Sequence, residues 1–300
     1  MEKHSAKRTL LIVLCCVLAV VLAAILVITI VMNRLLNQIQ HPEDTTLSSS
    51  KIEEILNANT VPGTTAPKVD PTIQTTEETQ REEQIRILLI GHVANSSESW
   101  QKSETMILCT LDTTAKTLTM TSFQRNAVVQ IPSHGSNQLN VAYSIGGMKL
   151  LNQCLEENFG VQVDGNVAVN FEGLISLVDM VGGISIHLTQ QEANYLNAHG
   201  NWGITNTGGW KLKAGENTLT GEQVMGYALM KEADQEVERT ERQRKVIVAL
   251  VEKAKGLSVA ELYDFVEAGL RCVSTDMTKD EILSYVTQLV PVLTELQLID

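Results

Sequence analysis

Several common kinds of site have no support in this 300-residue chain. Its five cysteines form no CxxC pair, and the three beyond residue 32 are scattered and odd in number, so no disulfide framework emerges. The six histidines show no HxxxH or His–Cys spacing, and neither a GxSxG motif nor a glycine-rich phosphate loop occurs. The folded part must therefore rely on its hydrophobic core.

Basic residues are also scarce. Lys and Arg number 23 against 35 Asp and Glu, which gives a formal net charge of -12. Without the first eight residues the balance is 20 against 34, or -14. Nonspecific nucleic-acid binding requires a basic surface that neutralises phosphates, so no nucleic-acid partner is expected.

Residues 9–32 form an uninterrupted apolar run of 24 residues without a charge. A helix of this length exceeds the hydrocarbon core of about 30 Å, and the run lacks the small-residue cleavage site of a signal peptide. Three basic residues precede it and Arg34 alone follows closely. The positive-inside rule then predicts an uncleaved transmembrane anchor in the cell membrane, with residues 1–8 cytoplasmic and the rest extracellular. A buried core helix is the alternative.

Residues 33–84 differ in composition from everything after them. They hold four of the six prolines and no aromatic residue, whereas all twelve aromatics follow residue 99. Such a segment buries too little apolar surface to offset its ordering entropy. It is expected to be a flexible extracellular linker with one short helix in SSSKIEEIL, followed by a single domain at 85–300.

The domain reads as strands that first alternate with helices and then give way to them. This order predicts an α/β fold, with a mixed sheet flanked by helices. Thr278 and Glu281 fit a capping box, and the glycine pair 182–183 is expected to end a helix. Strands are expected at 86–90, 104–112, 117–123, 166–171 and 184–189, with 127–132 as a further extension of the sheet. Helices are expected at 148–159, 172–183, 219–230, 237–255, 258–270 and 278–297.

The stretch VERTERQRKV, residues 237–246, concentrates positive charge at the start of one of these helices. At 100° per residue, Gln243 lies at about +40° and Val246 at about -20° from Arg239. The apolar stripe therefore runs into Arg239 and Gln243, with Arg242 at its edge. The opposite, solvated face is expected to hold Glu241, Arg244 and Lys245.

Buried guanidinium groups need partners, because an unpaired one costs several kcal/mol. One interpretation is an internal salt bridge to Asp234 or Glu236. The other is an anion pocket, where arginines at the helix start bind phosphate bidentately. Arg125 supports the pocket, since it is the lone charge after an apolar strand, a common position for ligand sites.

The order ILLIG, SETMIL, TSFQRN, VAYSIGG, LVDMVGGISI, LTGEQVMGYALMK and ERTERQ resembles the LytR-CpsA-Psr (LCP) family of bacterial envelope proteins over nearly all of residues 85–300. The resemblance implies a sheet with a hydrophobic groove for a polyprenyl chain. It also implies transfer of a glycopolymer from a polyprenyl-pyrophosphate carrier to peptidoglycan or another envelope acceptor. By the same resemblance, a Mg²⁺ ion bridges the pyrophosphate through acidic residues, here the metal ligand Glu104. The residues that it assigns to pyrophosphate and lipid binding are Arg125, Lys231, Arg239, Arg242 and Gln243, and the catalytic group is Arg125, Arg239, Arg242 and Glu236.

This sequence departs from the family pattern at its acidic and basic positions. Val93 replaces the first metal-binding Asp, and Asn126 replaces another acid. Leu229 and Lys231 stand where the family has Arg-x-Arg, so one cation is lost and one becomes a point charge. Loss of a carboxylate from so small a set should weaken magnesium binding severely.

Two hypotheses follow for the activity. The first is a divergent, active glycopolymer transferase. The second is a catalytically impaired member that binds polyprenyl phosphate or regulates envelope assembly. A third option is an envelope scaffold that binds neither lipid nor glycan.

Overall fold

The computed structural model describes residues 31, 33–41, 47–59, 84–92, 102–200, 210–230, 236–289 and 297–299. The chain divides into two units, Met1–Ile39 and Gln40–Asp300, and the features below belong to the second. Within the described ranges no helix has both the length and the apolar composition needed to cross a membrane. The anchor predicted at 9–32 lies outside those ranges except for residue 31.

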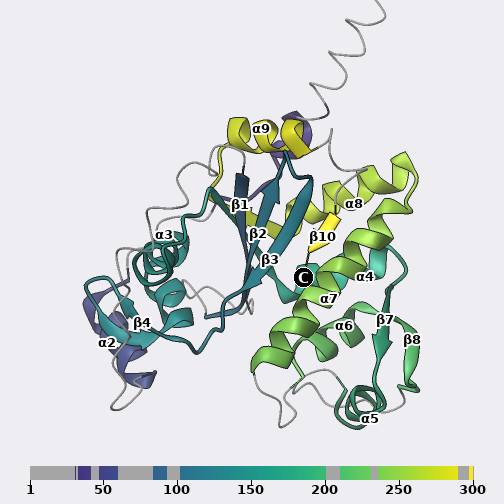
Figure 1. Ribbon diagram of the computed structural model, residues 1–300, viewed down its shortest axis with the longest axis horizontal. Coiled ribbons are helices and arrows are strands. Elements are labelled where there is room, and N and C mark those ends of the chain that lie inside the picture. Colours follow the sequence, from purple (N-terminus) through teal and green to yellow (C-terminus); the bar gives the residue numbers. More distant parts are fainter. Residues whose placement is uncertain are drawn as a thin grey trace, which may run out of the picture. The chain divides into compact units, whose positions relative to one another are not determined.

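The second unit is built on a mixed six-stranded sheet with the strand order β10-β3-β2-β1-β6-β9 (Figure 1). β1 pairs antiparallel with β2 and parallel with β6, so the predicted mixed α/β sheet is confirmed. The runs expected as strands at 104–112 and 117–123 form a hairpin, since β2 and β3 pair antiparallel. The strands are β1 (Gln84–His92), β2 (Ser103–Asp112), β3 (Thr117–Ser122), β6 (Gly165–Asn170), β9 (Val273–Thr275) and β10 (Gln297–Ile299).

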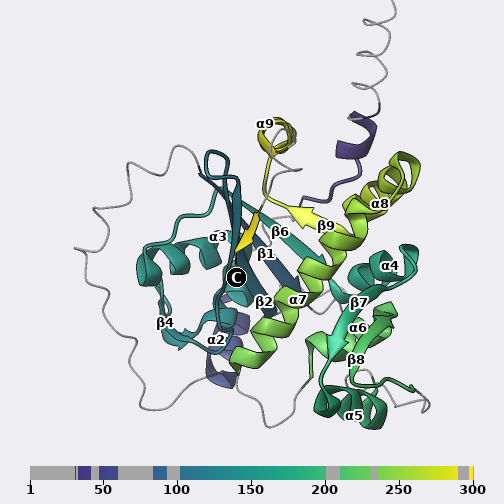
Figure 2. The same ribbon diagram turned by 45° about the vertical axis from the view of Figure 1, so that its right-hand side comes forward.

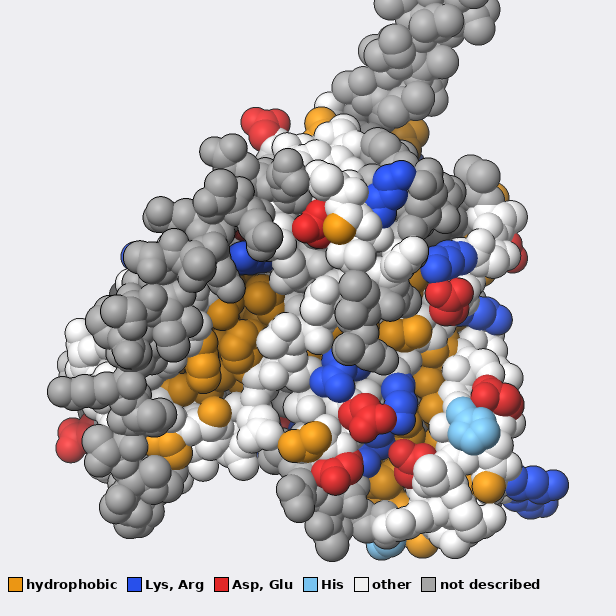
Figure 3. All heavy atoms as spheres, in the orientation of Figure 1, with side chains coloured by type: hydrophobic (Ala, Val, Ile, Leu, Met, Phe, Trp, Pro, Cys, Tyr) orange, Lys and Arg blue, Asp and Glu red, His pale blue; other side chains and the backbone are white. Residues whose placement is uncertain are grey.

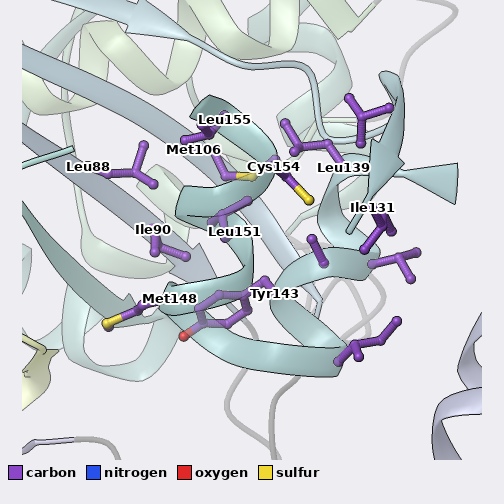
Figure 4. Packing of buried hydrophobic residues seen from close by; sticks show 14 of the residues in the cluster. Leu88, Ile90, Met106, Ile131, Leu139, Tyr143, Met148, Leu151, Cys154 and Leu155 are labelled. Atoms are coloured by element: carbon purple, nitrogen blue, oxygen red, sulfur yellow. The ribbon is translucent and has the colours of Figure 1, made fainter. Parts of the chain in front are cut away.

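One face of this sheet packs against helix α3 (Leu139–Phe159). Successive strand residues point to opposite faces, so Leu88 and Ile90 of β1 share the side that faces α3. Figure 4 shows them directed toward Leu151 and Tyr143 of the helix. All four side chains are almost completely buried and form part of the larger of the two main hydrophobic clusters.

Helix α3 begins earlier than the sequence predicts. The expected helix at 148–159 is its second half, and a kink at Gly146 and Gly147 joins it to a first half that starts at Leu139. Gly147 has φ 58°, which favours glycine. The first half is missed because residues 139–145 are buried throughout and lack amphipathic spacing. Gly160 ends the helix in the left-handed conformation.

The other face of the sheet meets helices α4 (Phe171–Met180), α6 (Gly221–Ala228) and α7 (Glu236–Lys255). Figures 1 and 2 show α3 and α7 on opposite sides of the sheet. A second cluster joins α6 and α7 to a small antiparallel sheet of β7 (Ile184–Leu188) and β8 (Gly215–Leu219). Helices α5 (Gln190–His199) and α8 (Val259–Cys272) complete this side, and α5 was not expected from the sequence.

The glycine pair after α4 is needed for close packing. Gly183 has φ 90°, and a Cβ there would lie 2.7 Å from the carbonyl oxygen of Leu219. Its N–H donates to the carbonyl of Val178 in the last turn of the helix. The prediction that Gly182 and Gly183 end a helix is therefore confirmed.

Two segments differ from expectation. Residues 127–132 do not extend the main sheet: β4 (Val128–Ile131) pairs with β5 (Gly135–Gln138) in a separate hairpin, whose turn contains Ser133 at φ 65°.

Within the supposed linker, the predicted short helix is present as α2 (Ser49–Ala58), but Ile52, Ile55 and Leu56 of this helix pack against the core. Three apolar side chains on one face are enough to dock this otherwise polar segment.

The end of the chain follows the predicted pattern in part. Helix α9 (Lys279–Leu289) begins with the predicted capping box, in which Thr278 N donates to Glu281 Oε2 at 2.7 Å and Glu281 N donates to Thr278 Oγ1 at 3.3 Å. The helix was expected to continue to 297, where the structure instead has β10 paired with β3.

Candidate functional site

The carboxylate of Glu104 lies at a bulge near the end of the central strands. Gly91 of β1 faces Thr105 of β2, but the next residue, His92, faces Ser103, so Glu104 has no partner in the register. A bulge of this kind redirects a side chain and is frequent beside functional sites. Glu104 thereby reaches residues from two other parts of the fold.

Two of the predicted arginines converge on this carboxylate. Arg125, in the turn between β3 and β4, donates from Nη1 to Glu104 Oε2 at 2.6 Å. Arg239 of α7 donates from Nη2 to the same oxygen at 2.6 Å. The exposed side-chain fractions are 25% for Arg125, 14% for Glu104 and 6% for Arg239. The sequence interpretation of an internal salt bridge was therefore right in kind, but the described carboxylate partner is Glu104.

These three residues, hereafter the arginine cluster, carry two positive charges and one negative charge. Charge-assisted bonds of this length are strong, and the low exposure of Arg239 limits competition from water. The excess positive charge, together with the partly exposed Arg125, gives the cluster the means to hold an anion that displaces or joins Glu104.

Arg242 has a different environment, although it is equally buried on the same helix. Its Nε donates to the carbonyl of Tyr227 at 3.2 Å and its Nη2 donates to that of Met230 at 3.1 Å. Gln243 Nε2 donates to the carbonyl of Ala228 at 3.5 Å. These carbonyls lie at the C-terminal end of α6, where helical carbonyls lack partners and the helix dipole favours a cation. Arg242 and Gln243 thus cap α6 in this structure.

The solvated face of α7 was predicted correctly in two positions out of three. Glu241 and Lys245 are each half exposed and form an ion pair of 2.7 Å. Arg244 is half-buried instead, since its Nη1 donates to Ser122 Oγ at 3.0 Å across the interface with β3. Val93, Lys231 and Asp234 lie outside the described residues, as does the side chain of Glu236.

An apolar pocket of about 240 Å³ is lined by residues of β2 and α7, the strand and helix that carry Glu104 and Arg239. It lies between β1, β2 and β6 and the helices α4, α6 and α7, on the face opposite α3. Thr105, next to Glu104, and Gln243, one turn from Arg239, are among its few polar residues. Its apolar walls are formed largely by Leu89, Phe171, Leu174, Val246, Ile247 and Leu250.

Leu229 also lines this pocket and is almost completely buried. An arginine there would have to place its charge among apolar side chains or turn away, so the loss of the family cation at this position suits the pocket observed. Sequence reasoning missed Thr105 and Phe171 as pocket residues. Alternation along β1 could have indicated the pocket, because Leu89 and Gly91 share the face opposite Leu88 and Ile90.

The donor set for a magnesium ion is incomplete among the described residues. They contain no group of three or more His, Cys, Asp or Glu side chains placed to hold a metal. Glu104 already accepts two guanidinium bonds at one oxygen, and the neighbouring Asn126 is uncharged. Magnesium needs octahedral oxygen ligation, which one such carboxylate does not provide. The described residues therefore do not fit the ion.

Asp112 cannot compensate for the missing acid. It lies at the opposite end of β2 from Glu104, eight residues or about 27 Å along the strand. Its Oδ1 accepts from Thr114 N at 3.0 Å and from Ala115 N at 2.7 Å, which fixes the hairpin turn.

The thiols of Cys109 and Cys154 are poor nucleophiles in this structure. Burial raises the pKa of Cys109 to about 11 and, with a contribution from Glu157, that of Cys154 to about 12. Both thiols are protonated at neutral pH, whereas nucleophilic attack requires a thiolate.

The fold and site together define a class of protein: an α/β domain in which the same strand and helix carry an apolar pocket and a cluster of arginines, suited to an amphiphile with an anionic head group. Comparison with known proteins agrees. The family model described as LytR_cpsA_psr family matches residues 31–294. The chain belongs to this family.

Individual relatives are more distant. The polyisoprenyl-teichoic acid–peptidoglycan teichoic acid transferase TagU of Oceanobacillus iheyensis is 28% identical over 212 residues, which cover 68% of this chain and 62% of the relative. Biofilm regulatory protein A of Streptococcus mutans is 30% identical over 203 residues, 61% of this chain and 47% of the relative. The chain thus spans less than two thirds of the length of either relative.

A solved structure of similar fold is the LytR-CPS2A-psr family protein YwtF (TagT) with bound octaprenyl pyrophosphate lipid. It superposes with a TM-score of 0.55 at 21% identity, and covers 78% of this chain and 83% of that chain. At this level of identity the likeness shows the fold, and the LCP-like architecture expected from the sequence is confirmed.

Proposed function

We propose that this protein binds a polyprenyl-pyrophosphate-linked glycopolymer and transfers the glycopolymer to peptidoglycan or another envelope acceptor. The observation that carries the proposal is that β2 and α7, which hold Glu104 and Arg239 of the arginine cluster, also line the apolar pocket. A polyprenyl pyrophosphate needs both a charged and an apolar site, joined without a gap. Two relatives support it by their names, as a teichoic acid transferase and as a protein with bound octaprenyl pyrophosphate.

The chain's own residues account for two parts of such a transfer. The apolar pocket excludes water from the prenyl chain next to the phosphates. When the pyrophosphate is cleaved, negative charge develops on the leaving phosphate, and Arg125 and Arg239 are placed to stabilise it. Glu104 is held by both arginines, so it keeps their guanidinium groups in position before the lipid arrives.

Magnesium remains a prediction from the family resemblance. A bound divalent cation would neutralise phosphate charge, and Glu104, the one carboxylate of the arginine cluster, would be its ligand there. Isothermal titration of the full chain with magnesium, with and without polyprenyl pyrophosphate, tests it. Binding that requires the lipid would show that phosphate oxygens complete the ligand set.

A second candidate is a non-catalytic protein that binds polyprenyl phosphate. The arginine cluster favours this candidate, because Glu104 already neutralises part of the positive charge of Arg125 and Arg239. Less positive charge is then available to stabilise a pyrophosphate during cleavage. Biofilm regulatory protein A, a relative at 30% identity, is named for regulation. The membrane location, with a single span at 9–32 and the domain outside, is part of both proposals and rests on the sequence.

The deciding experiment measures lipid binding and turnover on the same preparation. Full-length protein in detergent would be incubated with polyprenyl-pyrophosphate-linked glycopolymer and peptidoglycan, with and without magnesium. Transfer of labelled glycopolymer supports the transferase. Saturable lipid binding without transfer or pyrophosphate cleavage supports the second candidate, and no lipid binding contradicts both.

A further inference from the structure

A second and larger cavity lies on the opposite face of α7 from the apolar pocket. This groove has a volume of about 760 Å³ and runs between α7 and strand β7. Its floor is apolar, formed by Ile186 of the strand and by Val248 and Ala249 of the helix. Figure 3 shows hydrophobic side chains exposed between charged ones over this part of the molecule, at its right-hand side.

The wall opposite α7 is the edge of a strand. Ser185, Ile186 and His187 are consecutive, yet all three line the groove. Successive side chains of a strand point to opposite faces, so three in a row reach one cavity when the strand edge faces it. Within the described part of the chain β7 pairs with β8 alone. The other edge of β7 therefore offers backbone donors and acceptors to an extended peptide, as in β-strand addition.

Charged groups of both signs surround the apolar floor. α7 contributes Arg244, Lys245 and Lys253 together with two glutamates, whereas Glu192 comes from α5 and Glu216 from β8. A ligand with charges of one sign only would be repelled by the groove residues that carry the same sign. An extended peptide that carries both carboxylates and an ammonium group complements this mixture.

Helix α7 separates the two cavities along its length. Gln243, Val246 and Ile247 line the apolar pocket, whereas Arg244, Lys245 and Val248 line the groove. Near the start of the helix the two approach each other, because Arg244 bonds Ser122 at the end of β3, three residues before Arg125. A ligand in the groove could thus extend toward the arginine cluster without entering the apolar pocket.

We infer that the groove binds the peptide portion of a peptidoglycan acceptor as an added strand on β7. The inference rests on the proposed function for the identity of the acceptor. It adds a division of labour, in which the lipid donor occupies one face of α7 and the acceptor peptide the other. The peptide then directs the attached sugar toward the arginine cluster.

Binding of a defined probe to the full-length protein in detergent tests this inference. The probe is a fluorescent muramyl pentapeptide with lysine at its third position, compared with an analogue whose backbone amides are N-methylated. Val248→Trp fills the groove from a half-buried position, and Val266→Trp is the matched control at an exposed position on α8. Lys253→Glu, at an exposed position on the rim, provides a second groove variant that leaves the floor intact.

We expect Val248→Trp to weaken probe binding at least tenfold, and Lys253→Glu and N-methylation to weaken it several-fold. Val266→Trp should bind like the parent, and all variants should keep parental affinity for polyprenyl phosphate. Absence of saturable probe binding, unchanged binding by both groove variants, or equal binding of the N-methylated probe would overturn the inference. Loss of lipid binding in the parent would instead contradict the proposed function, and the probe measurement would still report on the groove.

Discussion

Arg239 and Arg242 lie one turn apart on α7 and are both almost completely buried, at 5% and 4% exposure. Arg239 bonds a carboxylate that it shares with Arg125. Arg242 bonds two backbone carbonyls at the end of α6. The difference shows that burial alone does not identify an anion-binding arginine. What distinguishes the two arginines is the group that each one bonds. An incoming phosphate can take the place of a carboxylate beside Arg239, whereas it cannot accept hydrogen bonds in place of the carbonyls that Arg242 would leave unpaired.

The largest effect is expected from Arg242→Ala. Removal of the guanidinium leaves the buried carbonyls of Tyr227 and Met230 without this donor, at a cost of about 1–3 kcal/mol for each unsatisfied group. The free energy of unfolding should therefore fall by about 3 kcal/mol, measured by denaturant titration of the full chain. Arg244→Ala is the control, since it removes one bond to Ser122 and should cost about 1 kcal/mol. Equal losses would show that Arg242 has no special structural role.

Arg239→Ala should act mainly on ligand binding. The variant keeps the bond between Glu104 and Arg125, so the loss in stability should be smaller than for Arg242→Ala. Affinity for polyprenyl pyrophosphate should fall about 100-fold, equivalent to about 2.7 kcal/mol, because a buried charge-assisted contact is lost. Equilibrium binding of a fluorescent lipid measures the change. If Arg242→Ala, in folded protein, reduces affinity as strongly, the contrast between the two arginines is wrong.

Glu104→Gln tests whether the carboxylate that Arg239 and Arg125 share opposes ligand binding. The glutamine keeps the size of the side chain but removes the negative charge that competes with phosphate for both arginines. Affinity for polyprenyl phosphate should rise about tenfold, or about 1.4 kcal/mol. Weaker binding in the variant would show that the carboxylate positions the arginines more than it opposes the ligand. Repeating the titration with magnesium tests the metal as well, since a ligand role for Glu104 predicts a magnesium effect that the variant loses.

Most helices and strands could be predicted from the sequence, because their signals lie in consecutive or helically spaced residues. The α7 stripe at Arg239, Gln243 and Val246 follows directly from helical spacing, and all three residues are buried. The hairpin of β2 and β3 follows from two β-rich runs around a short turn. Helix α5 was missed although Thr189 and Glu192 form a capping box, the signal that identified α9.

The partners of the buried arginines could not be predicted in the same way. Glu104 is 135 residues from Arg239 in the chain, and it reaches α7 because of a bulge in β2. No local sequence pattern predicts this bulge. The bonds of Arg242 depend on where α6 ends relative to α7. Helical geometry therefore established that both arginines turn inward, and tertiary packing determined what each one meets.

The exposed face of α7 provides the smallest expected effect. The hydrogen bond from Lys245 and its charge, followed by the charges of Arg244 and Arg242, lower the pKa of Glu241 below its usual value. A lowered folded-state pKa contributes stability above the unfolded-state pKa of about 4.5, and that contribution disappears as the pH falls through the folded value. Because the Glu241–Lys245 pair is half exposed, Glu241→Gln should cost under about 0.5 kcal/mol at pH 7. The difference should shrink as the pH falls through the lowered folded-state pKa, measured by denaturant titration at pH 7 and at a series of lower pH values. A loss as large as that of Arg242→Ala, or one that persists at low pH, would mean that Glu241 contributes through packing rather than charge.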